Sequence, residues 1–400
     1  MTDRGWLLRR FPVTTVLGLQ YAAFAIFPAL LHHDATSLLL SIVGFGLLAA
    51  FAVEALLAPL RRRGDDEGLT PPRWNPSRAV AVLVVGVASQ VAIALLSPSS
   101  YAVQLGSVSR SPVASLLTPF SYWTVAGSVL VLLAWRAGQM PLRRALWLLG
   151  ATSGVLLVVG IRQGILGGFR DYAVTMALMV LLTGIVRLRT VVLFGIGVAL
   201  IVPFLLHIRN QVRLSHGANQ FAVTASESQS RLREDTLINQ LQGLKLPLDL
   251  GQPSIRTTFR YGLIPSQFDK SRPPLHTGVL VDNALTGGNT SSTSFTVLGN
   301  AYAFEGFSGE VAYAAIVALL AGLLLWRRTP FRLVIFALAV NTLLTIEQSY
   351  PDGIAGFLQA LVAMIPVFVI CRVTLSLPAR EPASRAWLDQ YQRTVQRATR

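Results

Sequence analysis

Cysteine is nearly absent from this 400-residue chain, and charged residues are scarce. The single cysteine, Cys371, excludes a disulfide within the chain and a cysteine metal cluster. Asp, Glu, Lys and Arg make up only 13% of the residues, against about a quarter in soluble domains. The five histidines show no HExxH or similar spacing, so the sequence predicts neither a metal nor a cofactor.

Hydrophobic residues, by contrast, make up 52% of the chain and fall into runs of roughly 20 residues, enough to cross a bilayer as a helix. We therefore predict an all-α polytopic membrane protein with about ten transmembrane helices. The expected spans are 11–31, 36–57, 79–97, 119–136, 145–161, 171–187, 190–207, 309–326, 331–349 and 354–372.

The net charge of +15 is assigned to membrane topology and not to a nucleic-acid partner. With ten spans, most of the basic residues fall in segments on one side, which the positive-inside rule places in the cytoplasm. We expect a protein of the cytoplasmic membrane with both termini in the cytoplasm. Residues 1–207 would hold seven spans, 208–308 a long external segment, 309–374 three spans and 375–400 an amphipathic cytoplasmic tail.

The external segment contains one clear helix signal, in residues 224–250. Thr224 and Glu227 have capping-box spacing, and Gly243 and Pro247 mark the expected end. Leucine and isoleucine recur on one face, so we expect this amphipathic helix to lie over the mouth of the bundle.

Two arginines flank a short, glycine-rich loop on the predicted outer side, where the positive-inside rule disfavours them. These two arginines are Arg162 and Arg170. Two more, Arg209 and Arg213, follow the seventh expected span. Guanidinium groups bind phosphate well, so the four arginines could share an external pocket for a phosphate or diphosphate. The alternatives for Arg162 and Arg170 are pairing with Asp171, contact with lipid headgroups, or snorkelling to the interface.

The second half of the external segment mixes cations, hydroxyls and aromatic rings, a combination suited to a glycan. Arg260, Arg272 and Tyr302 are the candidate glycan-binding residues. Proton acceptors in this stretch include His276, Asp282, Glu305 and also Asp269 and Glu310. The simpler alternative is a polar loop that serves only as a connection.

These features together resemble the O-antigen polymerase, or oligosaccharide repeat-unit polymerase, family. The resemblance covers about residues 145–330 and includes Ile264-Pro265, the stretch Lys270 to Pro274, and "LGNAYAFEGFSGEV". Family members often have an aromatic and glycine-containing turn that enters a late span. The matching residues here are Gly299, Tyr302, Gly306, Phe307 and Gly309. Asn300 departs from the pattern, since an acidic residue is common there.

The resemblance implies a GT-C-like membrane glycosyltransferase that polymerises or ligates undecaprenyl-diphosphate-linked glycans outside the cytoplasmic membrane without a metal. Arg162, Arg170, Arg209 and Arg213 would stabilise the leaving diphosphate. His276, Asp282 or Glu305 would accept the proton of the acceptor hydroxyl, with Glu305 preferred. Membrane lipids and a chain-length regulator or other glycan assembly proteins are the implied partners.

Two other functions stay open. A transporter or flippase of lipid-linked glycans would need charges and broken helices near the bilayer midplane. Glu54, near the inner end of the second expected span, is expected to snorkel toward Arg61 to Arg63. A membrane scaffold whose external segment binds another protein is the third possibility.

Overall fold

The structure is a computed structural model. It describes residues 10–65, 75–97, 111–163, 166–183, 208, 211, 234–244, 246, 248, 255–264, 269, 281, 295–326, 329–346 and 350–371. Every regular element within these residues is a helix. Seven of the helical stretches are long and apolar enough to cross a membrane, which confirms a polytopic helical membrane protein.

The first group of helices contains the N-terminal spans. It comprises α2 (Pro12–Tyr21), a π-helical turn (Ala22–Ile26), α3 (Phe27–Leu31) and α4 (Ser37–Asp65). Glu54 of α4 is fully buried and caps the start of α2. Its carboxylate accepts hydrogen bonds from Val13 N at 2.8 Å, Thr14 N at 3.1 Å and Thr14 Oγ1 at 2.8 Å. The expectation that Glu54 snorkels to the interface is therefore wrong, because a helix N-terminus satisfies the carboxylate inside the protein.

The second group packs around a close antiparallel crossing of two helices. It comprises α5 (Pro76–Leu96), α7 (Pro112–Ser121), α8 (Trp123–Arg136), α9 (Leu142–Arg162) and α10 (Gly167–Leu182). A Cβ on Gly86 would lie 2.3 Å from Thr124 N, and one on Gly127 would lie 2.6 Å from Leu83 Cα. These two glycines allow the backbones of α5 and α8 to touch.

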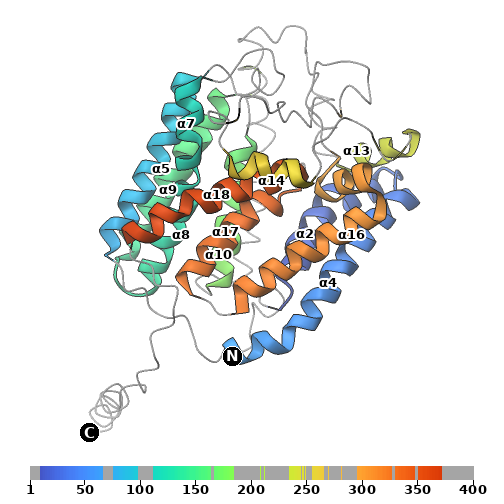
Figure 1. Cartoon of the computed structure of the whole chain (residues 1–400), viewed down its shortest axis with the longest axis horizontal. Helices are drawn as coiled ribbons and strands as arrows, with labels where there is room; N and C mark the ends of the chain where they lie inside the picture. Colours follow the sequence, from blue (N-terminus) through green and yellow to red (C-terminus); the bar gives the residue numbers. More distant parts are fainter. Residues whose placement is uncertain are drawn as a thin grey trace.

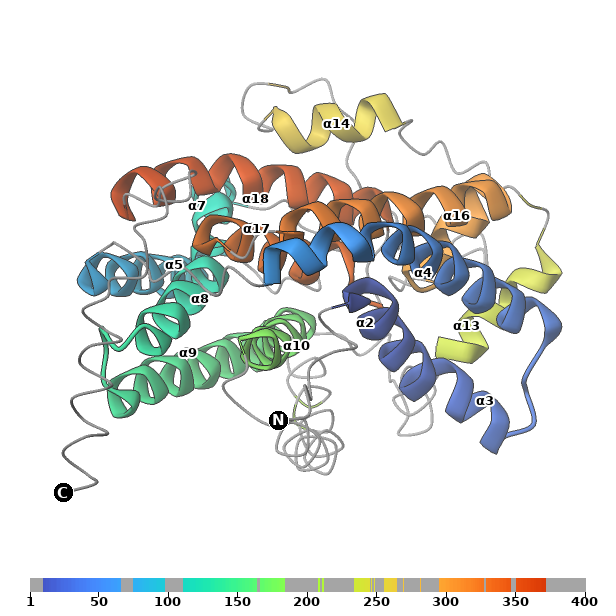
Figure 2. The same ribbon diagram turned by 90° about the horizontal axis from the view of Figure 1, so that it is seen from below.

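The third group completes the core. It comprises α16 (Val297–Trp326), α17 (Pro330–Leu343) and α18 (Tyr350–Cys371). Nearly every residue of α8 and of α17 is buried, and these two helices contact each other at the centre of the molecule. Figures 1 and 2 show α5, α7, α8 and α9 on one flank, α2, α4 and α16 on the other, and α10 between them.

Two short helices lie against the ends and sides of this bundle. The first, α13 (Glu234–Gln240), continues into a 3-10 turn (Leu241–Gly243) and meets the turn between α3 and α4. Asn239 donates to Asp34 O at 2.8 Å and accepts from Thr36 Oγ1 at 2.6 Å. The helix expected over the mouth of the bundle thus lies on the end of the bundle. Ile238 in α13 and Leu241 in the turn that follows are buried against it. The second, α14 (Ile255–Leu263), packs on α18 (Figure 2).

The described helices differ from the fourth, sixth, eighth and ninth expected spans. Helices α7 and α8 together form the fourth span and meet at Tyr122. The sixth and ninth expected spans correspond to shorter helices, α10 and α17, and the seventh, 190–207, lies outside the described residues. The expected boundary between external segment and eighth span, at 308, falls inside α16.

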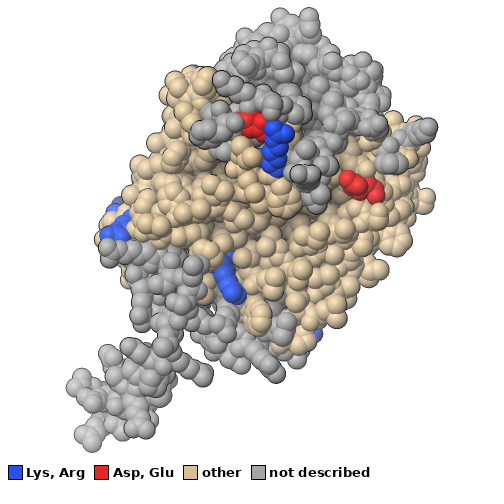
Figure 3. All heavy atoms as spheres, in the orientation of Figure 1, with Lys and Arg blue, Asp and Glu red and all other residues tan. Residues whose placement is uncertain are grey.

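The described surface in Figure 3 is mostly uncharged, with only a few blue or red groups. Large apolar side chains are highly exposed on the bundle, among them Leu56 at 78%, Trp147 at 71% and Val369 at 72%. Exposed apolar surface on this scale is typical of helices that face lipid.

Candidate functional site

Helix α16 is broken at Gly306, within the turn that carries the family resemblance. Gly306 has φ 70° and ψ −166°, a backbone conformation that essentially only glycine adopts. Leu298 and Glu310 both lie against Gly46 of α4, although a straight helix would separate them by about 18 Å. Residues 297–305 therefore form a short re-entrant helix that lies back along the start of the following span.

Contacts with three distant segments hold this re-entrant helix in place. Tyr21 Oη of α2 donates to Thr296 Oγ1 at 2.8 Å and accepts from Leu298 N at 3.0 Å. Val297 N donates to Ile346 O at 2.8 Å, and Leu248 N donates to Ala303 O at 2.8 Å. The last residues of the Ser/Thr-rich stretch are thus buried in the core, and they position the break that follows.

Glu305, the preferred proton acceptor, is the residue immediately before the break, and it is exposed. Its Oε1 accepts a hydrogen bond from Tyr350 Oη, at the first turn of α18, at 3.2 Å. A Cβ on Gly309 would lie 2.1 Å from Glu305 Cβ, so the chain can fold back tightly here only because residue 309 is glycine. The break thus presents the Glu305 carboxylate at the surface of the bundle.

Arg260 lies on α14, which packs along the middle of α18. A Cβ on Gly262 would lie 2.6 Å from Leu358 Cβ, and Gln359 Nε2 donates to Tyr261 O at 3.2 Å, so α14 is closely packed on α18. Tyr350 and Gln359 are nine positions apart, about 13 Å along the helix. Helix α18 therefore contacts Glu305 at its first turn and α14 about 13 Å further along.

The Arg260 guanidinium forms a two-pronged ion pair with Asp269. The hydrogen bonds that Arg260 donates to Asp269, and next the negative charge of Asp269, raise the pKa of Arg260 above its ordinary value. Arg260 thus remains a cation in a fixed orientation, with part of its side chain exposed. Asp269 was expected only as a possible proton acceptor, and its carboxylate is already engaged by Arg260.

Tyr302, a candidate glycan-binding residue, is half-buried and packs beside the break. Its ring centroid lies 4.6 Å from that of Phe307, and Phe307 lies 5.3 Å from Phe45 of α4. Phe307 and Phe45 are 40% and 49% exposed. An aromatic surface of this kind can cover the apolar face of a sugar ring.

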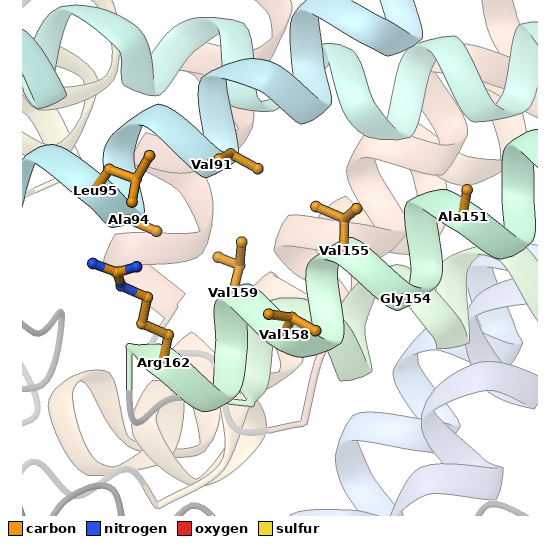
Figure 4. A pocket seen from close by; sticks show the side chains of 9 residues that line it. All are labelled: Val91, Ala94, Leu95, Ala151, Gly154, Val155, Val158, Val159 and Arg162. Carbon is orange, nitrogen blue, oxygen red and sulfur yellow. The ribbon is translucent and has the colours of Figure 1, made fainter.

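The two described arginines of the expected diphosphate pocket lie at the same end of the hairpin formed by α9 and α10. Arg170 donates to Asp171 Oδ1 from Nε at 3.1 Å and from Nη2 at 3.0 Å, the pairing considered as an alternative. Arg162 is exposed and lies at one end of an apolar pocket between α5 and α9 (Figure 4). Helix α9 is on one flank of the molecule and α16, with Glu305, is on the other (Figures 1 and 2).

Five expected site residues lie outside the described residues, so their roles stay predictions. These are Arg209, Arg213, Arg272, His276 and Asp282.

Glu310 was expected to be an external proton acceptor, but it is fully buried where α16 crosses α4. Neither carboxyl oxygen has a hydrogen-bond partner among the described residues. The backbone of Gly46 comes close without meeting hydrogen-bond geometry. A carboxyl group in this position is costly and is a frequent mark of function in membrane helices.

Tyr350 is the site component that sequence reasoning missed, and the burial of Glu310, predicted as an external proton acceptor, was also not foreseen. Nothing near Tyr350 in the sequence connects it to Glu305, which is 45 positions away. The burial of Glu310 could have been predicted, because no other charged residue follows it before Arg327 and it therefore begins an apolar span.

The chain matches no protein-family model, no curated protein and no solved structure. The candidate site is therefore defined by its own geometry. It comprises an exposed carboxylate at a helix break, a phenol that donates a hydrogen bond to it, an exposed aromatic surface, and a fixed cation on the helix that packs along α18.

Proposed function

We propose that this protein is a membrane glycosyltransferase that polymerises or ligates undecaprenyl-diphosphate-linked oligosaccharide units on the outer side of the cytoplasmic membrane. The observation that carries the proposal is the break at Gly306, which exposes the Glu305 carboxylate and lets it accept a hydrogen bond from Tyr350 Oη. The break occurs in the turn on which the family resemblance rests, and a plain spanning helix would not need it.

In the proposed reaction, the acceptor hydroxyl oxygen attacks the anomeric carbon of the donor sugar. The bond from that carbon to the diphosphate oxygen breaks, and the lipid diphosphate leaves with the electron pair. Glu305 accepts the hydroxyl proton as general base, and Tyr350 Oη orients its carboxylate. Tyr302 and Arg260 would contact the glycan, together with Arg272.

Cations must stabilise the charge that develops on the leaving diphosphate. We propose that this role falls to three of the expected arginines, Arg170, Arg209 and Arg213. For Arg170, a diphosphate would compete with Asp171 for the same guanidinium. Arg162, the fourth expected arginine, lies on α9, on the flank away from α16, and is not assigned this role.

Polymer synthesis by reconstituted protein tests the proposal. Lipid-linked repeat units are supplied, and glycan length is read on a gel for wild type, Glu305→Gln and Tyr350→Phe. A general base contributes a factor of about 100 to 10,000, so Glu305→Gln should lose at least about 100-fold in rate. Asp352→Asn, on the same turn of α18 as Tyr350, is the matched control and should keep its rate. Wild-type polymer from correctly inserted Glu305→Gln would refute the role of Glu305.

Glu310 favours a second candidate function, a transporter or flippase of lipid-linked glycans. An unpartnered carboxyl group beside a broken helix is a feature expected of such proteins. Vesicles with lipid-linked glycan in one leaflet distinguish the two functions. A transporter moves the glycan across without changing its bonds, and Glu310→Gln should then slow the movement. A transferase lengthens the glycan and leaves it on the same side.

A further inference from the structure

We infer that the apolar groove between α5 and α9 binds an anionic phospholipid, with the lipid phosphate on Arg162 and one acyl chain along the groove. This inference does not depend on the proposed transferase function. The groove has a volume of about 410 Å³, and in Figure 4 the Arg162 guanidinium lies at one end, near Leu95 of α5. Every other lining residue is Val, Leu, Ala or Gly.

The floor of the groove is low because Gly154 lacks a side chain. A Cβ built on Gly154 meets no atom within 4 Å, so the space above it is open. Val91 and Leu95 on α5 and Val158 on α9 form the walls. Val158 is 66% exposed and Leu95 is 58% exposed, so the groove opens toward the bilayer, from which a chain can enter sideways.

The polar end of the groove is fixed by a side chain next to Arg162. The buried Gln163 donates from Nε2 to Ala94 O at 2.9 Å and thereby joins the last turn of α9 to the last turn of α5. The backbone that carries Arg162 is therefore held at the mouth of the groove. A phosphate placed there would meet a guanidinium, the side chain best suited to bind it.

The length of the groove matches one leaflet. From Ala151 to Arg162 the groove extends along eleven residue steps of α9, about 16 Å. Half of a typical hydrocarbon core is about 15 Å. A chain in the groove with its phosphate at Arg162 would therefore end near the bilayer midplane, as an ordinary acyl chain of one leaflet does.

The position of the groove favours a bilayer phospholipid over the substrate of the proposed reaction. Only 22% of the α9 span is buried within the protein, so this helix faces lipid for most of its surface. Helix α9 and the Glu305 helix, α16, are on opposite flanks in both views. The contact of Arg162 with a lipid headgroup, one of the alternatives open from the sequence, is thus the one that the geometry favours.

Native mass spectrometry of the purified full chain tests the inference by titration with phosphatidylglycerol or phosphatidylcholine of the same acyl chains. Wild type should prefer phosphatidylglycerol, and Arg162→Ala should lose about fivefold of that preference, as expected for one basic residue near an anionic headgroup. Arg144→Ala, at the other end of α9, should change it less than twofold. A phosphatidylglycerol carrying a photoreactive group in its acyl chain should label residues 151–159.

Filling the groove provides the second arm, with a matched control on the same helix. Gly154→Leu should reduce the labelling of residues 151–159 at least fivefold. Gly150→Leu should not, because a Cβ on Gly150 also meets nothing within 4 Å but residue 150 does not line the groove. If Gly154→Leu fails to insert into the membrane, Val158→Phe offers a second way to fill the groove and should reduce the labelling in the same way. Three results would each overturn the inference. They are equal labelling in both glycine variants, no headgroup preference in wild type, and displacement of phosphatidylglycerol by equimolar undecaprenyl diphosphate.

Discussion

The position of Glu305 depends on Gly309, and a single added methyl group tests that dependence. An alanine at 309 would place its Cβ 2.1 Å from Glu305 Cβ. Non-bonded carbon atoms rest at about 3.5 Å or more, so the two positions must separate by about 1.4 Å. Both atoms are attached directly to the backbone, and the turn itself must therefore open. Overpacking of this kind costs about 1–3 kcal/mol of stability.

A shift of this size matters more for the reaction than for the fold. Tyr350 Oη lies 3.2 Å from Glu305 Oε1, and a displacement of about 1.4 Å away from it would end the hydrogen bond. Misplacement of a reacting group by about 1 Å can cost a factor of about 100. We expect Gly309→Ala to reduce the polymerisation rate about 100-fold at temperatures where it remains folded.

The assay compares polymerisation rate and thermal unfolding for Gly309→Ala and for Gly150→Ala. The control places a methyl group in open space in the middle of α9, where alanine is a better helix former than glycine by about 1 kcal/mol. The control should keep its rate, and its unfolding temperature should stay the same or rise slightly. A folded Gly309→Ala protein with the wild-type rate would refute the claim that the break positions the reacting carboxylate.

Three further predictions concern the bundle and α14. Replacing Glu54 with Leu removes three hydrogen bonds from the start of α2 and should destabilise the protein by about 2–4 kcal/mol, measured by thermal unfolding in detergent. Gly127→Ala puts a Cβ 2.6 Å from Leu83 Cα and should lower the unfolding temperature, whereas no change would mean that α5 and α8 cross less closely. Arg260→Glu should loosen the attachment of α14 and increase its cleavage by protease. If the ion pair orients the helix, adding Asp269→Arg should restore protection from the protease.

The sequence was sufficient to predict those helices that a continuous run of apolar residues specifies. Runs of apolar residues predicted α4, α5, α9 and α18, because the length of an apolar run alone decides whether it can span a bilayer. The break at Gly306 was also indicated, since glycine there fitted the turn of the family resemblance. The buried helix before the break was not predicted, because contacts with Tyr21 and Ile346 hold it, and neither residue is near it in sequence.

The charged groups were harder to place than the helices. The pairing of Arg170 with Asp171 was foreseen as an alternative because the two residues are adjacent. Arg260 and Asp269 are nine residues apart with Pro265 between them, and no helical or strand spacing relates them. Glu54 was placed at the interface because the sequence shows nearby arginines and does not show the start of α2 beside it.

The two carboxyl groups on either side of Gly306 are the basis for choosing between the candidate functions. Glu305 and Glu310 are five residues apart, yet the first is exposed and bonded to Tyr350 while the second is buried without a partner among the described residues. Residues five apart lie on different faces of a helix, so this contrast alone does not require the break, which the backbone angles of Gly306 show independently. Transferase chemistry needs an accessible base and would be insensitive to Glu310→Gln beyond its effect on stability. Transport would depend on Glu310 and tolerate Glu305→Gln, so the two substitutions should have opposite effects under the two functions.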